Sequence, residues 1–251
     1  MLTLLLFLIG SIFGSFYNVC IYRLPNDLDI ISKNSFCVSC KYKIPFYLNI
    51  PIISYIFNFG KCRNCKSKIS PSYLIVELLT AILFVYSFSL FGLSFKFLGF
   101  IIFYSSLIII FFTDFKYYLI LDKITYPLSV IGLIFSFLNL NPFNVDIISS
   151  ILGGVIGYFT IYIIRYLFFK IRKIEGMGLG DAKLFLMVGA WLGIKSIYLI
   201  LASSALVGAI VGSLIIFIYK KDKNFQIPYG CFIVIASALY PDLGSLFYNL
   251  I

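Results

Sequence analysis

An aspartate follows three alternating glycines in the segment Gly176-Met177-Gly178-Leu179-Gly180-Asp181-Ala182-Lys183. Glycine has no side chain, so a second helix or a substrate backbone can approach such a segment closely, and Gly178 and Gly180 are the expected points of approach. The segment leads from a basic stretch into an apolar one, which places Asp181 at a membrane boundary. An ionisable residue there costs free energy and usually marks a functional site.

A single aspartate does little hydrolytic chemistry, so Asp181 needs a partner. Asp114 closes the apolar run 108–113, and Asp122 follows eight residues later. Two carboxyl groups held close together in a low dielectric cannot both ionise cheaply, so one of them keeps its proton. The ionised group can then take a proton from water while the protonated group polarises a carbonyl. This is the chemistry of aspartic peptidases.

Each of these carboxylates also has a simpler interpretation. Asp181 is suited to cap the helix that follows it, where its charge complements the helix dipole. Asp114 is compatible with an interfacial residue that faces water, and Asp122, next to Lys123, with the start of a helix. Glu77 is either an interfacial carboxylate or a ligand contact. The residue types alone leave these alternatives open.

Two Cys-x-x-Cys pairs stand in the polar region after the first apolar segment. Their members are Cys37, Cys40, Cys62 and Cys65. Four thiolates can close a tetrahedral zinc site that staples a small segment together, and neighbouring cations favour the thiolate form. Disulfides and free thiols are the alternatives, and a cytosolic location disfavours disulfides. Cys20 and Cys231 lie in apolar segments and are interpreted as small hydrophobic residues.

The composition places these groups in a helical membrane protein. Of the 251 residues 61% are apolar and 12% are charged, and the mean hydropathy is +1.04. The apolar runs are continuous and long enough to cross a bilayer as helices, which argues against a barrel. Helices are predicted at residues 1–21, 72–91, 97–113, 119–138, 146–169, 181–193, 197–219 and 228–250. The fold class is an all-α polytopic membrane protein with about eight transmembrane helices and a small cytoplasmic zinc-knuckle insertion.

The distribution of charge predicts the topology. The net charge is +10, but the lysines and arginines cluster between apolar segments, as topology signals do, which argues against nucleic-acid binding. Residues 23–71 carry eight of these bases and only two acids, so this region is predicted to be cytoplasmic. All but two of the 20 lysines and arginines, Lys96 and Lys195, then fall on the inner side, together with Asp114 and Asp181. The chain has no histidine, which excludes Ser-His and Cys-His nucleophile pairs and HExxH metalloproteases.

The ordered set of motifs resembles the bacterial type IV prepilin peptidases, the bifunctional leader peptidases and N-methyltransferases of the GxGD aspartyl protease group. Besides the two cysteine pairs, the matching stretches are Gly14–Val19, Tyr22–Pro25, Asn49–Tyr55, Val76–Thr80 and Gly176–Leu184. Two positions depart from the family pattern. Leu121 stands where the family commonly has proline, and Ile227-Pro228-Tyr229-Gly230-Cys231 replaces the usual glycine-proline that follows Ile-Pro-Phe. Neither change removes a carboxylate.

The resemblance implies that Asp114 and Asp181 are the catalytic pair and that Asp122 is not. It implies cleavage of a short basic leader from prepilin or pseudopilin substrates, after a glycine and on the cytoplasmic side of their apolar helix. It also implies N-methylation of the new amino terminus with S-adenosylmethionine. Family precedent points to Gly60 for methylation, with a simple turn glycine as the equal alternative. The implied location is the lipid bilayer of the bacterial cytoplasmic (inner) membrane.

Three domains follow from the resemblance. Residues 1–22 form the first transmembrane helix, residues 23–71 a four-cysteine region linked to methyltransferase activity, and residues 72–251 a seven-helix peptidase domain. A transporter or channel with proton- or cation-binding carboxylates is the main alternative function, but the matched interrupted helices of two repeats are absent from the sequence. A peptidase that has lost methylation is disfavoured by the intact cysteine pairs and Gly60.

Overall fold

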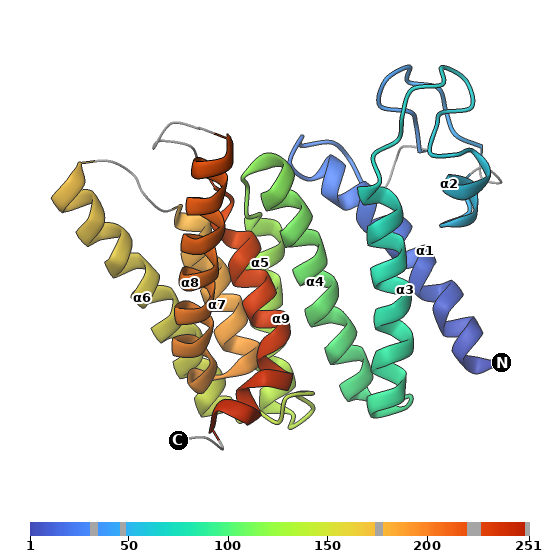
Figure 1. Ribbon diagram of the computed structural model, residues 1–251. Helices are drawn as coiled ribbons and strands as arrows, with labels where there is room; N and C mark the ends of the chain where they lie inside the picture. The colour runs from blue at the N-terminus through green and yellow to red at the C-terminus, as the bar shows by residue number, and fades with distance from the viewer. Residues whose placement is uncertain (31–34, 46–48, 174–177, 220–226, 249–251) are drawn as a thin grey trace. The chain divides into compact units, whose positions relative to one another are not determined.

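The computed structural model describes residues 1–30, 35–45, 49–173, 178–219 and 227–248. Within these residues the secondary structure is helical (Figure 1), and the only β-structure is two isolated β-bridges. The chain divides into two compact units, Met1–Ile101 and Ile102–Ile251. Helix α4 (Phe95–Tyr117) begins in the first unit and continues in the second.

In the first unit, α1 (Leu2–Arg23) packs against α3 (Ser72–Phe91), and the short helix α2 (Ile53–Phe57) lies in the connection between them. Gly10 and Gly14 allow this contact to be made by backbone atoms. An ideal Cβ on Gly10 would lie 2.8 Å from the Cα of Ala81, and one on Gly14 would lie 2.7 Å from the Cα of Glu77. Side chains at these glycines would therefore force the two helices apart.

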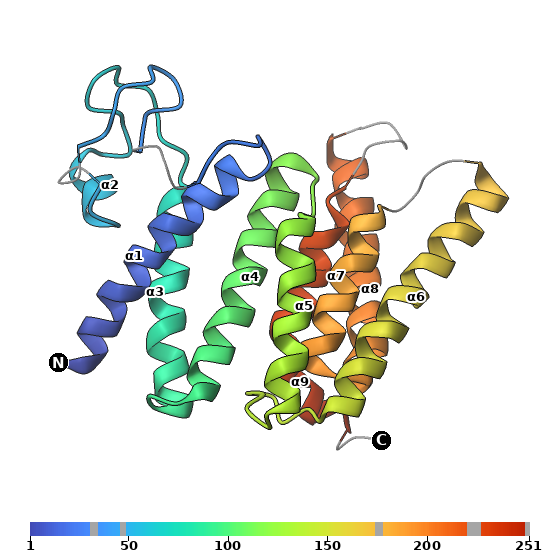
Figure 2. The same cartoon turned by 180° about the vertical axis from the view of Figure 1, so that it is seen from behind.

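The second unit is arranged around α7 (Leu179–Leu192). Its other helices are α5 (Asp122–Phe137), α6 (Ile147–Arg172), α8 (Ile194–Tyr219) and α9 (Tyr229–Tyr248). Helix α7 contacts all four of these helices, and α5 and α6 can be followed beside it in Figure 2. With 14 residues, α7 is about 21 Å long, shorter than the roughly 30 Å hydrocarbon core of a bilayer. Other helices, and not lipid, cover most of its surface.

Glycines bring α6 and α7 into backbone contact. An ideal Cβ on Gly153 would lie 2.6 Å from the carbonyl oxygen of Gly189, and one on Gly189 would collide with the backbone of Gly153. One turn away, the Ser150 hydroxyl donates a hydrogen bond to the carbonyl oxygen of Ala190. The α6 backbone thus forms one wall of the enclosure around α7.

Most helices begin and end within a few residues of the positions predicted from the sequence. Five of them are long and apolar enough to span a membrane, which makes the chain a multi-pass membrane protein. These are Leu2–Arg23, Ser72–Phe91, Phe95–Tyr117, Ile147–Ile171 and Ile194–Ile218. Among the described residues, α5, α7 and α9 do not meet that criterion. Gly176 and the last residues of the predicted helix 228–250 lie outside the described part of the chain.

Two local features were not predicted. No pattern in the sequence indicated α2, and α5 begins three residues later than the predicted segment 119–138. The backbone at Leu121 is extended, with φ −84° and ψ 122°, so the helix starts only at Asp122. The helix thus starts at Asp122 although an ordinary leucine, and not a proline, precedes it.

The contact between α6 and α7 predicts a difference between two Gly→Ala variants. We expect Gly189→Ala to lower the free energy of unfolding by about 1–3 kcal/mol, because its methyl group meets a fixed backbone. The matched control is Gly208→Ala on α8, whose methyl group would lie 3.3 Å from the movable ring of Phe232. Thermal unfolding in detergent measures both, and equal midpoints for the two variants would contradict the packing argument.

Candidate active site and metal centre

Asp181 lies in the first turn of α7 and is 7% exposed. The helix begins at Leu179, with Gly178 as its N-cap, so Asp181 is not the capping residue itself. Its carboxylate accepts a hydrogen bond from the backbone N–H of Gly178. A carboxylate in this position satisfies one free donor of the helix end and complements the helix dipole. The capping interpretation is therefore partly right, and it does not explain why the group is buried.

Asp114 lies in the last turns of α4 and is 5% exposed. Its Oδ2 accepts a hydrogen bond of 2.9 Å from the backbone N–H of Cys231, in the first turn of α9. Gly230 leaves room for this contact, since an ideal Cβ there would lie 2.8 Å from the same oxygen. Asp114 is thus enclosed by protein, in contrast to the alternative of an interfacial residue that faces water.

The carboxyl groups of Asp114 and Asp181 are close enough to interact electrostatically. Ile120 fills the space beside them. Its side chain lies where a Cβ on Gly180 or on Gly230 would stand, at 2.9 Å in each case. Gly180 therefore faces Ile120, whereas Gly178 borders the Asp181 carboxylate, 3.7 Å from the position of an ideal Cβ.

Asp122 has a different environment from the other two aspartates. It is the first residue of α5, and both of its carboxylate oxygens accept hydrogen bonds from Nζ of Lys183, at 2.7 and 2.8 Å. The Asp122 side chain is 55% exposed. Asp122 is therefore exposed and paired with a lysine, and it does not belong to the buried pair of carboxyl groups. The simpler interpretation from the sequence, that Asp122 starts a helix, agrees with its place as the first residue of α5.

The four cysteines of the Cys-x-x-Cys pairs form a cluster in the first unit. All four sulfur atoms lie within 4.8 Å of one another, with 3.9 Å between the Sγ atoms of Cys37 and Cys65 and 4.0 Å between those of Cys40 and Cys62. Tetrahedral ligation at about 2.3 Å requires sulfur atoms about 3.8 Å apart, and a disulfide requires about 2.05 Å. The spacing fits a metal site and not a disulfide.

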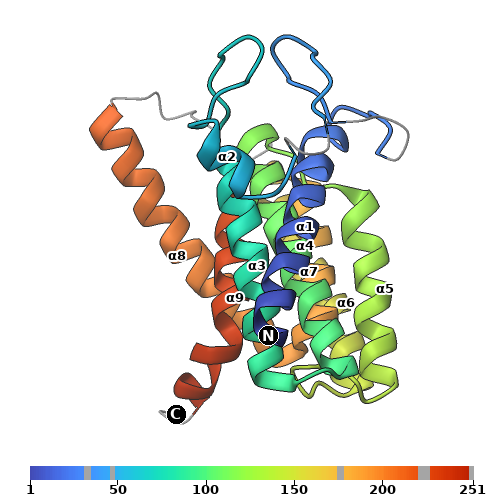
Figure 3. The same ribbon diagram turned by 90° about the vertical axis from the view of Figure 1, so that its right-hand side faces the viewer.

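Two similar loops carry these cysteines, and they stand side by side in Figure 3. A β-bridge closes each loop, Phe36 with Lys43 and Lys61 with Lys68. The backbone N–H that ends each Cys-x-x-Cys turn bonds back to the carbonyl of its first cysteine. Burial raises the pKa of the Cys37 thiol, but backbone N–H groups of Cys40 and Ser39 outweigh it and bring that pKa to about 6. A thiolate at neutral pH is the form that binds metals.

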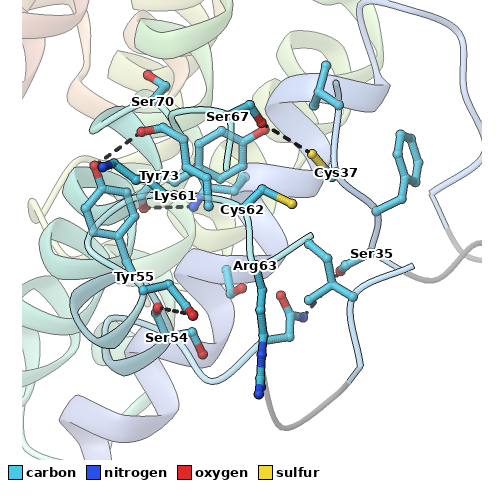
Figure 4. A pocket seen from close by; sticks show the side chains of 18 of the residues that line it. Ser35, Cys37, Ser54, Tyr55, Lys61, Cys62, Arg63, Ser67, Ser70 and Tyr73 are labelled. Carbon is cyan, nitrogen blue, oxygen red and sulfur yellow. Dashed lines mark hydrogen bonds between the residues drawn. The ribbon is translucent and has the colours of Figure 1, made fainter. Parts of the chain in front are cut away.

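A cavity of about 460 Å³ lies between these loops and the adjoining ends of α1 and α3 (Figure 4). Aromatic side chains such as Tyr55 and Tyr73 line it together with hydroxyl, amide and charged groups. Gly60 is not among the lining residues. It has φ +63°, and an ideal Cβ there would lie 2.9 Å from the Tyr55 hydroxyl, so it supports the cavity through Tyr55. The structure thus gives Gly60 a turn role that also affects the cavity.

Sequence reasoning missed several contacts at the carboxylates. The first turn of α9 lies beside both groups: Cys231 bonds to Asp114, and Tyr229 interacts electrostatically with Asp181. The only sequence signal was that residues 227–231 depart from the family pattern. The ion pair of Lys183 with Asp122 had no signal, because 61 residues separate the two positions.

The fold and the site together define a class: a multi-pass helical membrane protein with two buried, interacting carboxyl groups at helix ends. Comparisons with known proteins give its family. Residues 8–91 match the bacterial peptidase A24 N-terminal domain, and residues 101–213 match the type IV leader peptidase family. Residues 92–100, between the two matches, lie just before the boundary of the two compact units at Ile101.

Curated relatives agree with these matches. A prepilin leader peptidase/N-methyltransferase of Vibrio cholerae is 38% identical over 80% of this chain and 82% of its own length. Proteins of the same name from Xanthomonas campestris and Pseudomonas aeruginosa are 33% and 31% identical, each over 91% of this chain and 86% of the relative. No solved structure matches. The chain belongs to the type IV leader peptidase family.

The cysteine cluster predicts the metal content of the purified protein. Four thiolates select soft metals, so we expect one equivalent of such a metal per chain, measured by elemental mass spectrometry. Cys62→Ser should lose it, because three remaining thiolates leave the site open. Cys20→Ser, the same change at a buried cysteine of α1 outside the cluster, should keep it. A metal-free wild type with four reactive thiols in this region would contradict the prediction.

Proposed function

We propose that this chain cleaves the leader peptide of prepilin-like proteins by an aspartyl mechanism and then N-methylates the new amino terminus. Asp114 and Asp181 carry the cleavage. The observation on which this rests is their arrangement: two buried carboxyl groups from distant parts of the chain interact at the ends of α4 and α7. The names of the relatives supply the substrate class, a prepilin leader, and the second reaction.

In the proposed cleavage, the two carboxyl groups share one proton, because two like charges this close cannot both ionise cheaply. The ionised group takes a proton from water, whose oxygen attacks the scissile carbonyl carbon. The protonated group donates a hydrogen bond to the carbonyl oxygen. Collapse of the tetrahedral intermediate then breaks the C–N bond, and the leaving nitrogen takes up a proton. Gly178, next to Asp181, lets the extended substrate backbone approach.

The proposed setting is the cytoplasmic (inner) membrane of a bacterium. Eight helices lie in it, α5, α7 and α9 included, with the short α7 enclosed by its neighbours, and the active site and the cysteine region face the cytoplasm. The support is the clustering of lysines and arginines on one predicted side. The substrate has a basic leader and an apolar helix. We keep the division into residues 1–22, 23–71 and 72–251 as the proposed domains for the first span, the cysteine region and the peptidase.

For the methylation, we propose that the cysteine cluster holds structural zinc and that the neighbouring cavity binds S-adenosylmethionine. When bound, this donor supplies an electrophilic methyl group on a sulfonium. The cavity fits it in size, since small-molecule sites measure about 300–1,000 Å³. Its lining also fits: Tyr22 and Tyr73 offer rings to a purine or a cation, and Asn18 and Asn58 offer amides to polar groups. Gly60 supports this cavity through Tyr55.

The dyad is tested by three Asp→Asn variants of purified protein with a prepilin-like substrate and S-adenosylmethionine. We expect Asp114→Asn and Asp181→Asn to lose leader cleavage, because an amide in place of either carboxyl group cannot share the proton of the pair. Asp122→Asn is the matched control and should still cleave, since its carboxylate is exposed and paired with Lys183. Mass spectrometry reads leader loss and methyl addition separately. Folded Asp114→Asn and Asp181→Asn proteins that still cleave would disprove the aspartyl mechanism.

The contact between α9 and Asp114 gives a second prediction. We expect Gly230→Ala to slow cleavage by about 100-fold, because its methyl group would lie 2.8 Å from Asp114 Oδ2 and displace the carboxylate. Methylation of a pre-cleaved peptide should remain, since the proposed methylation cavity lies in the other unit. Steady-state rates of the two reactions check this, with Gly208→Ala as control. Normal cleavage by Gly230→Ala would show that the position of this carboxylate is not critical.

A further inference from the structure

Glu77 is a buried carboxylate that the proposed peptidase does not use. It lies on α3, is 8% exposed and lines the cavity of the first unit. Its Oε2 accepts a hydrogen bond of 2.6 Å from the backbone N–H of Ile52, and the Ser15 side chain also hydrogen-bonds to it. Four cations line the same cavity, Arg23, Lys61, Arg63 and Lys68, but among the described residues no lysine or arginine forms an ion pair with Glu77.

The backbone that meets Glu77 is strained. Ile52, the N-cap of α2, has φ +64° and ψ −55°. A positive φ is an outlier for a β-branched residue and costs of the order of 1–3 kcal/mol. Such a conformation persists only where its surroundings hold it, and the short hydrogen bond to Glu77 is one of the contacts made by the backbone of Ile52, together with the bond from Ile56 N–H to its carbonyl oxygen. Two unfavourable features, a buried carboxylate and a strained residue, thus meet at the wall of one cavity.

An unpaired buried carboxylate is costly, and two neutral donors offset only part of that cost. A cationic ligand would offset the rest. An ammonium group suits the position best, because its N–H bonds make short, charge-assisted hydrogen bonds to a carboxylate. Two ammonium groups can reach this cavity under the proposed function: the new amino terminus of the substrate and the amino group of the methyl donor.

We propose that Glu77 binds the α-ammonium group of the cleaved substrate and accepts its proton, which rests on the proposed methylation in this cavity. An ammonium nitrogen has no free electron pair and cannot attack a methyl group. The proton passes from the nitrogen to the Glu77 carboxylate. The freed electron pair forms the N–CH₃ bond to the methylsulfonium donor, and the electrons of the S–CH₃ bond return to sulfur. Protonated Glu77 then releases its proton to water.

The first test is binding, which needs no turnover. The probes are a peptide with the mature amino terminus of the substrate, free or acetylated, and S-adenosylhomocysteine. One charge-assisted hydrogen bond contributes about 1.5–3 kcal/mol, so the wild type should bind the free amine about 10–100-fold more tightly than the acetylated peptide. Glu77→Gln keeps the size of the side chain and its acceptor for Ile52. It should lose this discrimination and keep its affinity for S-adenosylhomocysteine.

The outcomes of the binding test are distinct. If Glu77→Gln still discriminates between the two peptides, the proposal is overturned. If it keeps that discrimination and loses affinity for S-adenosylhomocysteine, Glu77 binds the amino group of the donor and the proposal is also overturned. Asp27→Asn is the matched control, because it removes one carboxylate from the same unit and asparagine tolerates the φ of +49° at that position.

The second test is the pH dependence of methylation. A positioned base contributes about 10²–10⁴-fold, so Glu77→Gln should methylate about 100-fold more slowly at pH 7. Its rate should recover as the pH rises through about 8, where a free α-amino group loses its proton. A merely structural role predicts an equal loss at every pH and would overturn the proposal. Leader cleavage and retained metal serve as checks on folding, and Glu77→Asp should keep part of the binding.

Failure of the proposed function gives a different result. If the wild type cleaves a leader and never adds a methyl group, the assignment of N-methylation to this chain falls. The comparison of free and acetylated peptides still decides whether Glu77 binds an ammonium group in that case.

Discussion

The backbone contact between α6 and α7 is the constraint on which the second unit depends. Helix α7 is too short to span a bilayer by itself, and it is stable because neighbouring helices surround it. Gly153 and Gly189 bring the nearest wall within backbone distance. The same enclosure removes water from the first turn of α7, where Asp181 lies. The burial of the carboxylate is therefore a consequence of helix packing, and it raises the energetic cost of a second charge nearby.

Three aspartates of one unit show how environment separates residues of the same type. Asp114 and Asp181 are buried and receive backbone N–H donors, whereas Asp122 is exposed and paired with Lys183. Burial strengthens the electrostatic interaction between the first two, because the protein interior has a lower effective dielectric constant than water. The ion pair of the third joins α5 to α7 at the surface, where such a pair contributes little to stability. The environments therefore support proton transfer by the buried pair of carboxyl groups and not by Asp122.

The sequence predicted the elements better than the contacts. Long apolar runs predicted the helices, because hydrophobicity is a local signal. The cluster of four thiols followed from spacing alone. The hydrogen bond from Cys231 to Asp114 spans 117 residues, and the one from Ile52 to Glu77 spans 25. Such contacts arise from tertiary packing, which no local pattern encodes, so the role of α9 was not predicted, and the sequence left Glu77 as either an interfacial carboxylate or a ligand contact.

The first turn of α9 places a departure from the family pattern directly beside the carboxylate of Asp114. Where the family commonly has proline, this chain has Cys231, and proline has no backbone N–H to donate. The N–H of Cys231 belongs to the first turn of a helix, where such groups lack partners within the helix. It bonds instead to Asp114 and stabilises negative charge on that oxygen. Gly230, which the pattern retains, is the residue that lets the helix end approach the carboxylate closely. A side chain at position 230 would collide with the carboxylate, whereas the Cys231 side chain is buried and its Sγ lies 3.4 Å from the carbonyl oxygen of Phe111.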